Sequence, residues 1–222
     1  VYKIKNHEIV GVLCDGMGGH LAGEVASTLV SRYVIEHFFD HSPFLDDESI
    51  HAWISSLLLT ANDLVNKESD MHSEYAGMGT TIVICYMDGK NTYISHVGDS
   101  RAYLYKDTLK QITADDTFVN ELVKRGLINA EEASHHPKRN VLVQAIGIKE
   151  ALRISFYKIE EDYRAILLCS DGLYNSLSSQ QIEEILQKNA SVDQKTECLI
   201  QSANEFGGLD NIGVLLIEKG EA

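Results

Sequence analysis

Short apolar runs bordered by an aspartate constrain the fold of this chain more than any other feature. The run EIVGVLCD ends at Asp15 and the run AILLCSD ends at Asp171, and a glycine follows each aspartate. Asp99 follows YISHVG, and Asp210 directly precedes NIGVLLI. Short runs rich in Val, Ile and Leu predict buried β-strands. We therefore expect a strand-built core that carries carboxylates at the ends of its strands.

Helices and hairpin-joined strands are interspersed along the rest of the chain. Apolar periodicity predicts helices at 22–39, 47–67, 117–125, 130–134, 178–188 and 192–206. We expect Asp47 to cap the second helix, and Ser178 with Gln181 forms a capping-box pattern. Strands are predicted at 8–14, 80–86, 91–96, 101–105, 154–159, 163–169 and 212–217, with more β-rich chain up to 112. We expect 68–79 to be a polar loop and 154–159 to pair with 163–169. This alternation predicts one α+β domain over residues 1–222, with mainly antiparallel sheets.

The charge of the chain excludes some classes of partner. The formal net charge is −14, and no basic footprint for nucleic acid is present. The same charge disfavours anionic membranes, and the longest apolar runs are far too short to span a bilayer. We expect neither nucleic acid nor membrane as a partner. The acidic excess has two interpretations: it keeps the protein soluble, or it gathers carboxylates for a metal.

The cysteines indicate a reducing compartment. Cys14, Cys85, Cys169 and Cys198 form no CxxC pair, and three of them lie in or at the end of predicted strands. Free cysteine in such places packs as a small apolar side chain. No secretory signal is visible. We therefore expect reduced cysteines and a cytoplasmic protein.

The four aspartates suit a site for a hard cation. Asp-Gly is a common hairpin turn, but Asp15 and Asp171 are each followed by a helical pattern instead of a returning strand. For Asp99 the turn interpretation stays open. Magnesium and manganese prefer oxygen ligands from carboxylates, main-chain carbonyls and water. A glycine such as Gly16 lets the backbone approach an ion.

Two other kinds of site fit less well. The nine histidines form no HExxH or comparable pattern. GMGGH, after Asp15, has neither the spacing of a dinucleotide loop nor the Lys-Ser or Lys-Thr of a Walker loop. We therefore prefer a magnesium or manganese site to a zinc site or a nucleotide loop.

Several longer motifs occur in a fixed order along the chain. They are DGMGGHLAGEVAS, GMGTT, HVGDSRAYLY, HHPKRNVLVQAIG, CSDGLYNSL and DNIGVLLI. In this order they closely resemble the bacterial form of the type 2C metal-dependent protein serine/threonine phosphatases. The resemblance covers nearly the whole chain. It implies a four-layer αββα sandwich, in which two antiparallel sheets pack face to face with helices on both outer sides.

The resemblance also implies an activity and a set of site residues. The activity is hydrolysis of phosphoserine and phosphothreonine in protein substrates by two manganese or magnesium ions. Asp15 would bridge the ions, the carbonyl of Gly16 would hold one, and Asp171 and Asp210 would hold the other. Asp99 would share a weaker third ion with Asp171. We expect a cytoplasmic monomer in which a metal-activated water attacks the phosphate.

The chain departs from the family pattern at three places. Family members usually carry an arginine that binds substrate phosphate near their start, and no arginine precedes Asp15 here. We therefore expect that the phosphatase domain is truncated at its N-terminus. Met17 stands where eukaryotic members have a proton-donating histidine, and Asn175 stands where the family often has an aspartate.

Two alternatives stay open at this point. The first is a non-catalytic binding module with the same fold, which the missing arginine and Asn175 favour and the intact Asp15, Asp171 and Asp210 oppose. The second is a regulator dedicated to one signalling phosphoprotein. The residues do not separate this regulator from a phosphatase of broad specificity.

Overall fold

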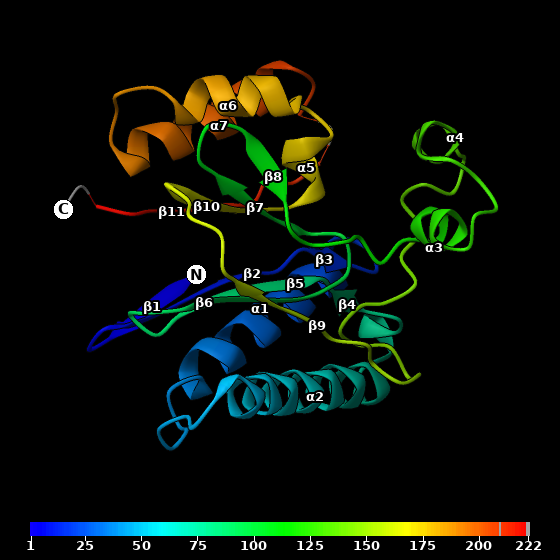
Figure 1. The fold of residues 1–222 in the computed structure, drawn as a ribbon. Helices are drawn as coiled ribbons and strands as arrows, with labels where there is room; N and C mark the ends of the chain where they lie inside the picture. Colours follow the sequence, from blue (N-terminus) through cyan, green and yellow to red (C-terminus); the bar gives the residue numbers. More distant parts are fainter. Residues whose placement is uncertain (209, 221–222) are drawn as a thin grey trace.

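Two antiparallel sheets, stacked face to face, form the centre of the computed structural model (Figure 1). The structure describes residues 1–208 and 210–220. The strands are β1 (Tyr2–Lys5), β2 (Glu8–Leu13), β3 (Gly16–Met17), β4 (Gly79–Thr80), β5 (Ile82–Met87), β6 (Thr92–Val97), β7 (Arg101–Tyr105), β8 (Leu109–Gln111), β9 (Ser155–Ile159), β10 (Ala165–Cys169) and β11 (Val214–Glu218). The first sheet has the order β1-β2-β5-β6-β9, the second has the order β11-β10-β7-β8, and β3 pairs with β4 in a short ribbon.

Helices cover the outer face of each sheet, so the predicted four-layer αββα sandwich is confirmed. The helices are α1 (His20–His37), α2 (Asp47–Met71), α3 (Phe118–Lys124), α4 (Ala130–Ser134), α5 (Asp171–Tyr174), α6 (Ser179–Leu186) and α7 (Val192–Glu205), with a 3-10 turn at Ser73–Tyr75. In Figure 1, α1 and α2 lie against the first sheet, and α5, α6 and α7 lie against the second. Within the described residues, no helix is both long and apolar enough to cross a bilayer.

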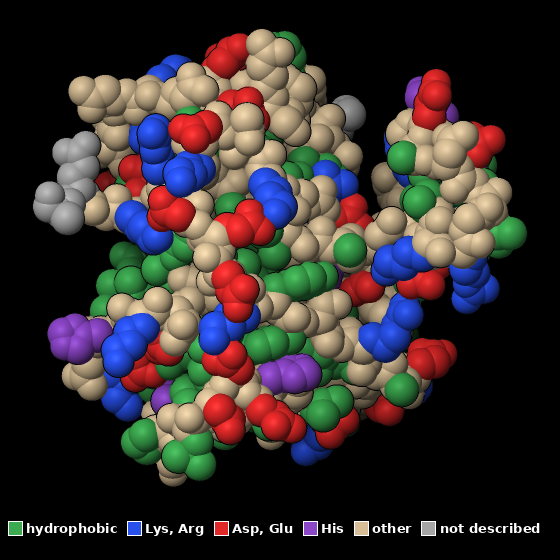
Figure 2. Space-filling view, viewed as in Figure 1, with side chains coloured by type: hydrophobic (Ala, Val, Ile, Leu, Met, Phe, Trp, Pro, Cys, Tyr) green, Lys and Arg blue, Asp and Glu red, His purple; other side chains and the backbone are tan. Residues whose placement is uncertain are grey.

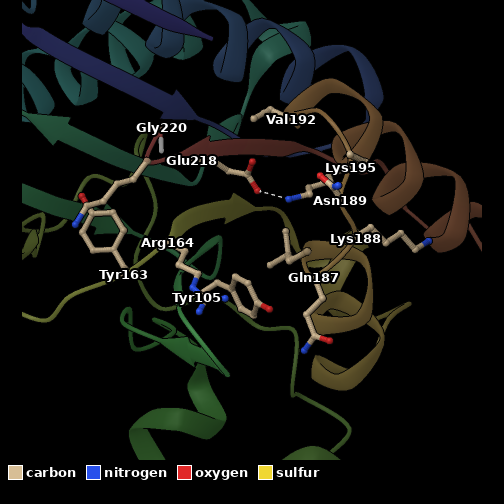
Figure 3. Close-up of a pocket in the computed structure, with 13 residues that line it drawn as sticks. Tyr105, Tyr163, Arg164, Gln187, Lys188, Asn189, Val192, Lys195, Glu218 and Gly220 are labelled. Carbon is tan, nitrogen blue, oxygen red and sulfur yellow. Dashed lines mark hydrogen bonds and ion pairs between the residues drawn. The ribbon is translucent and has the colours of Figure 1, made fainter. Parts of the chain in front are cut away.

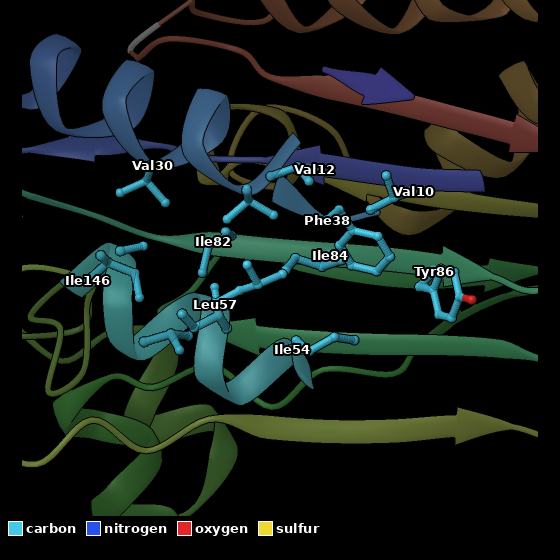
Figure 4. Close-up of a cluster of buried hydrophobic side chains, with 14 of the residues drawn as sticks. Val10, Val12, Val30, Phe38, Ile54, Leu57, Ile82, Ile84, Tyr86 and Ile146 are labelled. Carbon is cyan, nitrogen blue, oxygen red and sulfur yellow. The ribbon is translucent and has the colours of Figure 1, made fainter. Parts of the chain in front are cut away.

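Three layers of apolar side chains hold the sandwich together. Strand β5 shows why the predicted strands are apolar on both faces. Its residues Ile82, Ile84 and Tyr86 pack against the helix layer, while Val83 and Cys85 pack between the two sheets. Figure 4 shows the helix side of this arrangement. Because successive side chains of a strand point to opposite faces, a strand between two buried layers must be apolar throughout.

The second helix begins at the predicted residue, Asp47, but has a different N-cap and a later end. Asp46, not Asp47, is the N-cap: its side chain accepts a hydrogen bond from the Ser49 amide at 2.8 Å. Asp47 instead accepts a hydrogen bond from the hydroxyl of Tyr93 at 2.8 Å. The helix also continues to Met71, into the segment predicted as a loop. Burial of Val65 and of Met78 keeps this region ordered despite its polar sequence.

The predicted pairing of 154–159 with 163–169 is wrong. Strand β9 pairs with β6 in the first sheet, and β10 pairs with β7 and β11 in the second. The connection between β9 and β10 therefore crosses from one sheet to the other. A hairpin and a crossover of this length look alike in sequence, because the choice depends on which partner strand each apolar face meets.

The two short helices α3 and α4 form an arm that projects from the sandwich (Figure 1). Figure 2 shows this arm, residues 117–141, as a separate lobe with a cleft between it and the α5–α7 layer. The base of the arm is fixed where the amide of Phe118 donates to the carbonyl of Val141 at 2.7 Å. Thr117 caps α3 by accepting from the Asn120 amide.

Candidate metal centre

The strand directions bring the predicted acids to one edge of the sandwich. Strands β2 and β6 both run antiparallel to β5, so their ends, which lead to Asp15 and Asp99, lie at the same edge. In the second sheet β10 leads to Asp171, and the start of β11, which follows Asp210, lies beside the end of β10. Asp15 is close enough to Asp171, Asp210 and Asp99 for each of them to act on its ionisation. The structure thus brings all four predicted aspartates together.

Asp15 is held by its main chain. The Asp15 carbonyl accepts from the Thr81 amide and from the Thr80 hydroxyl, both at 2.8 Å. The Asp15 amide donates to Oγ1 of Thr81 at 3.0 Å. The next residue, Gly16, pairs with Thr80 in the β3–β4 ribbon and packs so closely on Gly23 of α1 that a Cβ at Gly16 would lie 2.0 Å from the Gly23 carbonyl oxygen. The glycine is required here by close approach of two backbones.

Asp171 and Asp210 are brought together by the loops that carry them. The Gly213 amide donates to Oγ of Ser170 at 2.8 Å, and this hydroxyl donates to the carbonyl of Asn211 at 3.1 Å. A Cβ at Gly172 would lie 2.3 Å from that carbonyl oxygen, so the two loops are in direct contact. Asp210 is exposed and Asp171 is half-buried. The loop contact places both carboxylates at the mouth of the site.

Asp99 lies deeper than the other three acids. It is 9% exposed and follows Gly98, whose φ of 107° is accessible to glycine but strained for other residues. Oγ of Ser100 lies 2.7 Å from Oγ1 of Thr81, the residue that also fixes Asp15. The Asp99 loop is therefore part of the site's framework and not a free hairpin turn.

The acids repel one another and are poorly hydrated. Burial and the charges of Asp171, Asp210 and Asp99 raise the pKa of Asp15 to about 7. Burial and the charge of Asp171 raise the pKa of Asp99 to about 7 as well. The pKa of Asp171 is raised by burial and by Asp210. Arg101 is a nearby cation that acts in the opposite direction on Asp99 and on Asp171.

This donor set fits a divalent cation of the hard class. The site offers carboxylates and a main-chain carbonyl, which magnesium and manganese prefer. Among residues 1–208 and 210–220, no three acidic, histidine or cysteine side chains converge closely enough to enclose one ion by themselves. Bound ions would complete their coordination with the main-chain carbonyl and with water, as magnesium usually does. That these residues bind metal stays a prediction.

Sequence reasoning missed the residues that support the acids. Thr80, Thr81 and Ser100 fix the backbone around Asp15 and Asp99, and the only signal for them was their place in the motifs GMGTT and HVGDSR. Asn175 also contacts the site, because its Nδ2 donates to Asp171 Oδ2 at 3.2 Å. Met17 is exposed beside Gly16.

A large cavity lies away from these acids. It has a volume of about 970 Å³ and is lined by the start of β10, the end of β11 and the α6–α7 turn (Figure 3). This is the opposite end of β10 from Asp171. Its buried cation, Lys195, is paired with Glu218 at 2.7 Å. The cavity contains none of the predicted site residues.

Known proteins of one kind match the chain in sequence and in structure. The family model described as Protein phosphatase 2C matches residues 2–204. The serine/threonine phosphatase stp of Listeria welshimeri serovar 6b is 35% identical over 221 residues, which cover 99% of this chain and 88% of that protein. Protein phosphatase PhpP of Streptococcus pneumoniae serotype 2 is 36% identical over 215 residues, which cover 95% of this chain and 85% of that protein.

Solved structures agree with these matches. The serine/threonine phosphatase of S. agalactiae superposes with a TM-score of 0.88 at 33% identity, covering 96% of this chain and 88% of that one. The catalytic domain of the phosphatase PstP, solved with two manganese ions, superposes with a TM-score of 0.77 at 34% identity, covering 97% of this chain and 92% of that one. The chain therefore belongs to the protein phosphatase 2C family of metal-dependent serine/threonine phosphatases.

Proposed function

We propose that this phosphatase works with two manganese or magnesium ions, held by Asp15, the carbonyl of Gly16, Asp171 and Asp210. Asp15 would bridge the ions, since it lies among the other acids. Asp99 and Asp171 would share a third ion, held more weakly. The relative PstP, whose catalytic domain was solved with two manganese ions, supports the number of strongly bound ions.

The raised pKa of Asp15 carries this proposal. A carboxyl group whose pKa lies at about 7 because of burial and neighbouring aspartates is in a site with unbalanced negative charge. Divalent cations would balance that charge. Structural ion pairs would also do so, but Arg101, the cation that favours ionisation of Asp99 and of Asp171, is paired with Asp115.

The chain's own residues orient and hold the site, and the cations supply the attacking group. When bound, divalent cations would activate water for attack at neutral pH and would neutralise charge on the phosphoryl oxygens. Thr80 and Thr81 hold the main chain of Asp15, and so fix the point at the edge of the sandwich from which its side chain extends. Met17 has no proton to donate, so the proton for the leaving serine or threonine oxygen would come from solvent.

The direct test is phosphate release from a phosphothreonine peptide. We expect turnover with added manganese or magnesium, loss of turnover in excess chelator, and a loss of at least about a hundredfold in Asp15→Asn, which removes a ligand but keeps the side-chain volume. Turnover that persists in excess chelator would refute the metal mechanism. Peptide binding without phosphate release, with metal present, would indicate the non-catalytic module instead.

A further inference from the structure

One aromatic side chain connects the Asp99 loop to the rest of the site. Tyr174, the last residue of α5, donates its hydroxyl to the main-chain carbonyl of Asp99 at 3.1 Å. Helix α5 begins at Asp171. The same short helix therefore carries one proposed ligand of the third ion at its first residue and a contact to the other ligand at its last residue.

The ring of Tyr174 is itself held in place. The guanidinium of Arg101 stacks on it, with 3.5 Å between the guanidinium carbon and the ring centroid. Arg101 is fixed in turn by a bidentate ion pair with Asp115. Its Nη2 donates to Oδ2 at 2.7 Å and its Nε donates to Oδ1 at 3.0 Å. Nη1 of Arg101 also donates to the hydroxyl of Tyr103 at 3.0 Å. A stacked and bidentate arginine of this kind is well fixed in orientation.

The same framework reaches the Asp99 loop from a second direction. The amide of Asp116 donates to the Gly98 carbonyl at 2.8 Å, and the Gly98 amide donates to Asp116 Oδ2 at 3.1 Å. These bonds fix the residue before Asp99, whereas Tyr174 fixes the carbonyl of Asp99 itself. The backbone of Asp99 thus has partners on both sides, and the Tyr174 hydroxyl is the partner that comes from the helix of Asp171.

We propose that Tyr174 is a positioning residue, which holds the backbone of Asp99 so that its carboxylate and that of Asp171 can share one cation. This proposal rests on the proposed function and adds a residue to it. The Tyr174 hydroxyl fixes the position of the Asp99 carbonyl through its hydrogen bond. The stacking of the Tyr174 ring on Arg101 fixes the position of that hydroxyl. Tyr174 touches no substrate in this role, so its removal changes how tightly the shared cation is held and leaves the Asp15–Asp210 side intact.

The test is Tyr174→Phe, which deletes the hydroxyl and keeps the ring under Arg101. Manganese titration by calorimetry should show the tight binding steps unchanged and the weak step weakened about three- to tenfold, the range for loss of one hydrogen bond. At limiting manganese, kcat for the phosphothreonine peptide should fall by a similar factor with KM unchanged. Excess manganese should restore kcat. The Asp99→Ala variant should lose the weak step, which identifies this step as binding of the ion held by Asp99.

Tyr163→Phe is the matched control, because it removes a tyrosine hydroxyl that contacts the Thr92 hydroxyl and lies just before β10, at the end away from Asp171. We expect it to match the parent in every manganese step. Tyr174→Leu, which also removes the ring, should weaken the weak step further. A Tyr174→Phe protein that matches the parent in the weak step and in kcat would overturn the role. So would equal weakening of all steps together with a lowered melting temperature. A parent without metal-dependent turnover would instead refute the proposed function.

Discussion

The carboxyl groups of Asp15 and Asp171 lie close enough to act on each other's ionisation, although the two residues follow strands of different sheets. Asp15 follows β2 of the first sheet and Asp171 follows β10 of the second. Burial and the charges of Asp171, Asp210 and Asp99 raise the pKa of Asp15, and burial and the charge of Asp210 raise that of Asp171.

The raised pKa values of the buried acids predict how stability depends on pH. The pKa of Asp15 and of Asp99 is raised to about 7 in the folded state, from 3.8 for a free aspartate. The folded protein then binds more protons than the unfolded chain between those two values, so stability falls as pH rises through this window. We expect the melting temperature in chelator to fall between about pH 4.5 and 7.5, and manganese to remove most of this decline.

Differential scanning fluorimetry across that pH range, with chelator or manganese, measures the effect. Asp15→Asn is the control, because the amide does not titrate and its metal-free slope should be shallower than that of the parent. A parent and an Asp15→Asn variant with the same slope in chelator would show that this cluster does not govern the pH dependence.

Replacing a proposed ligand should separate metal binding from folding. Asp171→Asn and Asp210→Asn each remove a negative charge from a like-charged cluster, so repulsion in the metal-free protein decreases. We expect manganese affinity and turnover to fall by at least about tenfold, because charge on the ligands sets much of the affinity. Melting temperatures in chelator should be unchanged or slightly higher. A clearly lower melting temperature in chelator would mean that these aspartates serve as caps or turn residues.

Asn175→Asp should change the melting temperature in chelator and the manganese affinity in the opposite directions. The Asn175 amide donates to Asp171 Oδ2, and a carboxylate in its place would repel Asp171 in the metal-free protein. We expect a lower melting temperature in chelator and tighter binding of manganese in the weak step. The affinity of that step should rise by only about a few-fold, because Asn175 is exposed. Calorimetry and fluorimetry on the same preparation measure both. Weaker manganese binding in this variant would contradict the placement of the third ion.

Gly23→Ala tests the support of Gly16 by α1. Alanine normally stabilises a helix relative to glycine by about 1 kcal/mol, but a Cβ here would lie 2.8 Å from the carbonyl carbon of Gly16. We expect a lower melting temperature and weaker manganese binding, because the Gly16 carbonyl must move. Thr28→Ala, at an exposed position of the same helix, should cause neither change. A stabilised Gly23→Ala protein with unchanged manganese binding would show that this contact is not important.

The sequence by itself determined the fold class, most elements and the identity of the acids. Apolar runs such as those of β2 and β10 predict buried strands, because they are short and consist largely of β-branched and aliphatic side chains. Local hydrogen bonds also follow from local sequence: the predicted capping box of Ser178 and Gln181 is present, with the Gln181 amide donating to the Ser178 hydroxyl at 3.3 Å.

Only the tertiary structure decided which segments meet. Several features depend on contacts between residues far apart in the chain. They are the strand partners of β9 and β10, the hydrogen bonds of Thr80 and Thr81 to Asp15, and the stacking of Arg101 on Tyr174. Periodicity reports which face of an element is buried, but not against what. The convergence of the acids also needed the strand directions of two sheets, because a carboxylate becomes part of a site through the neighbours that fix, desolvate and repel it.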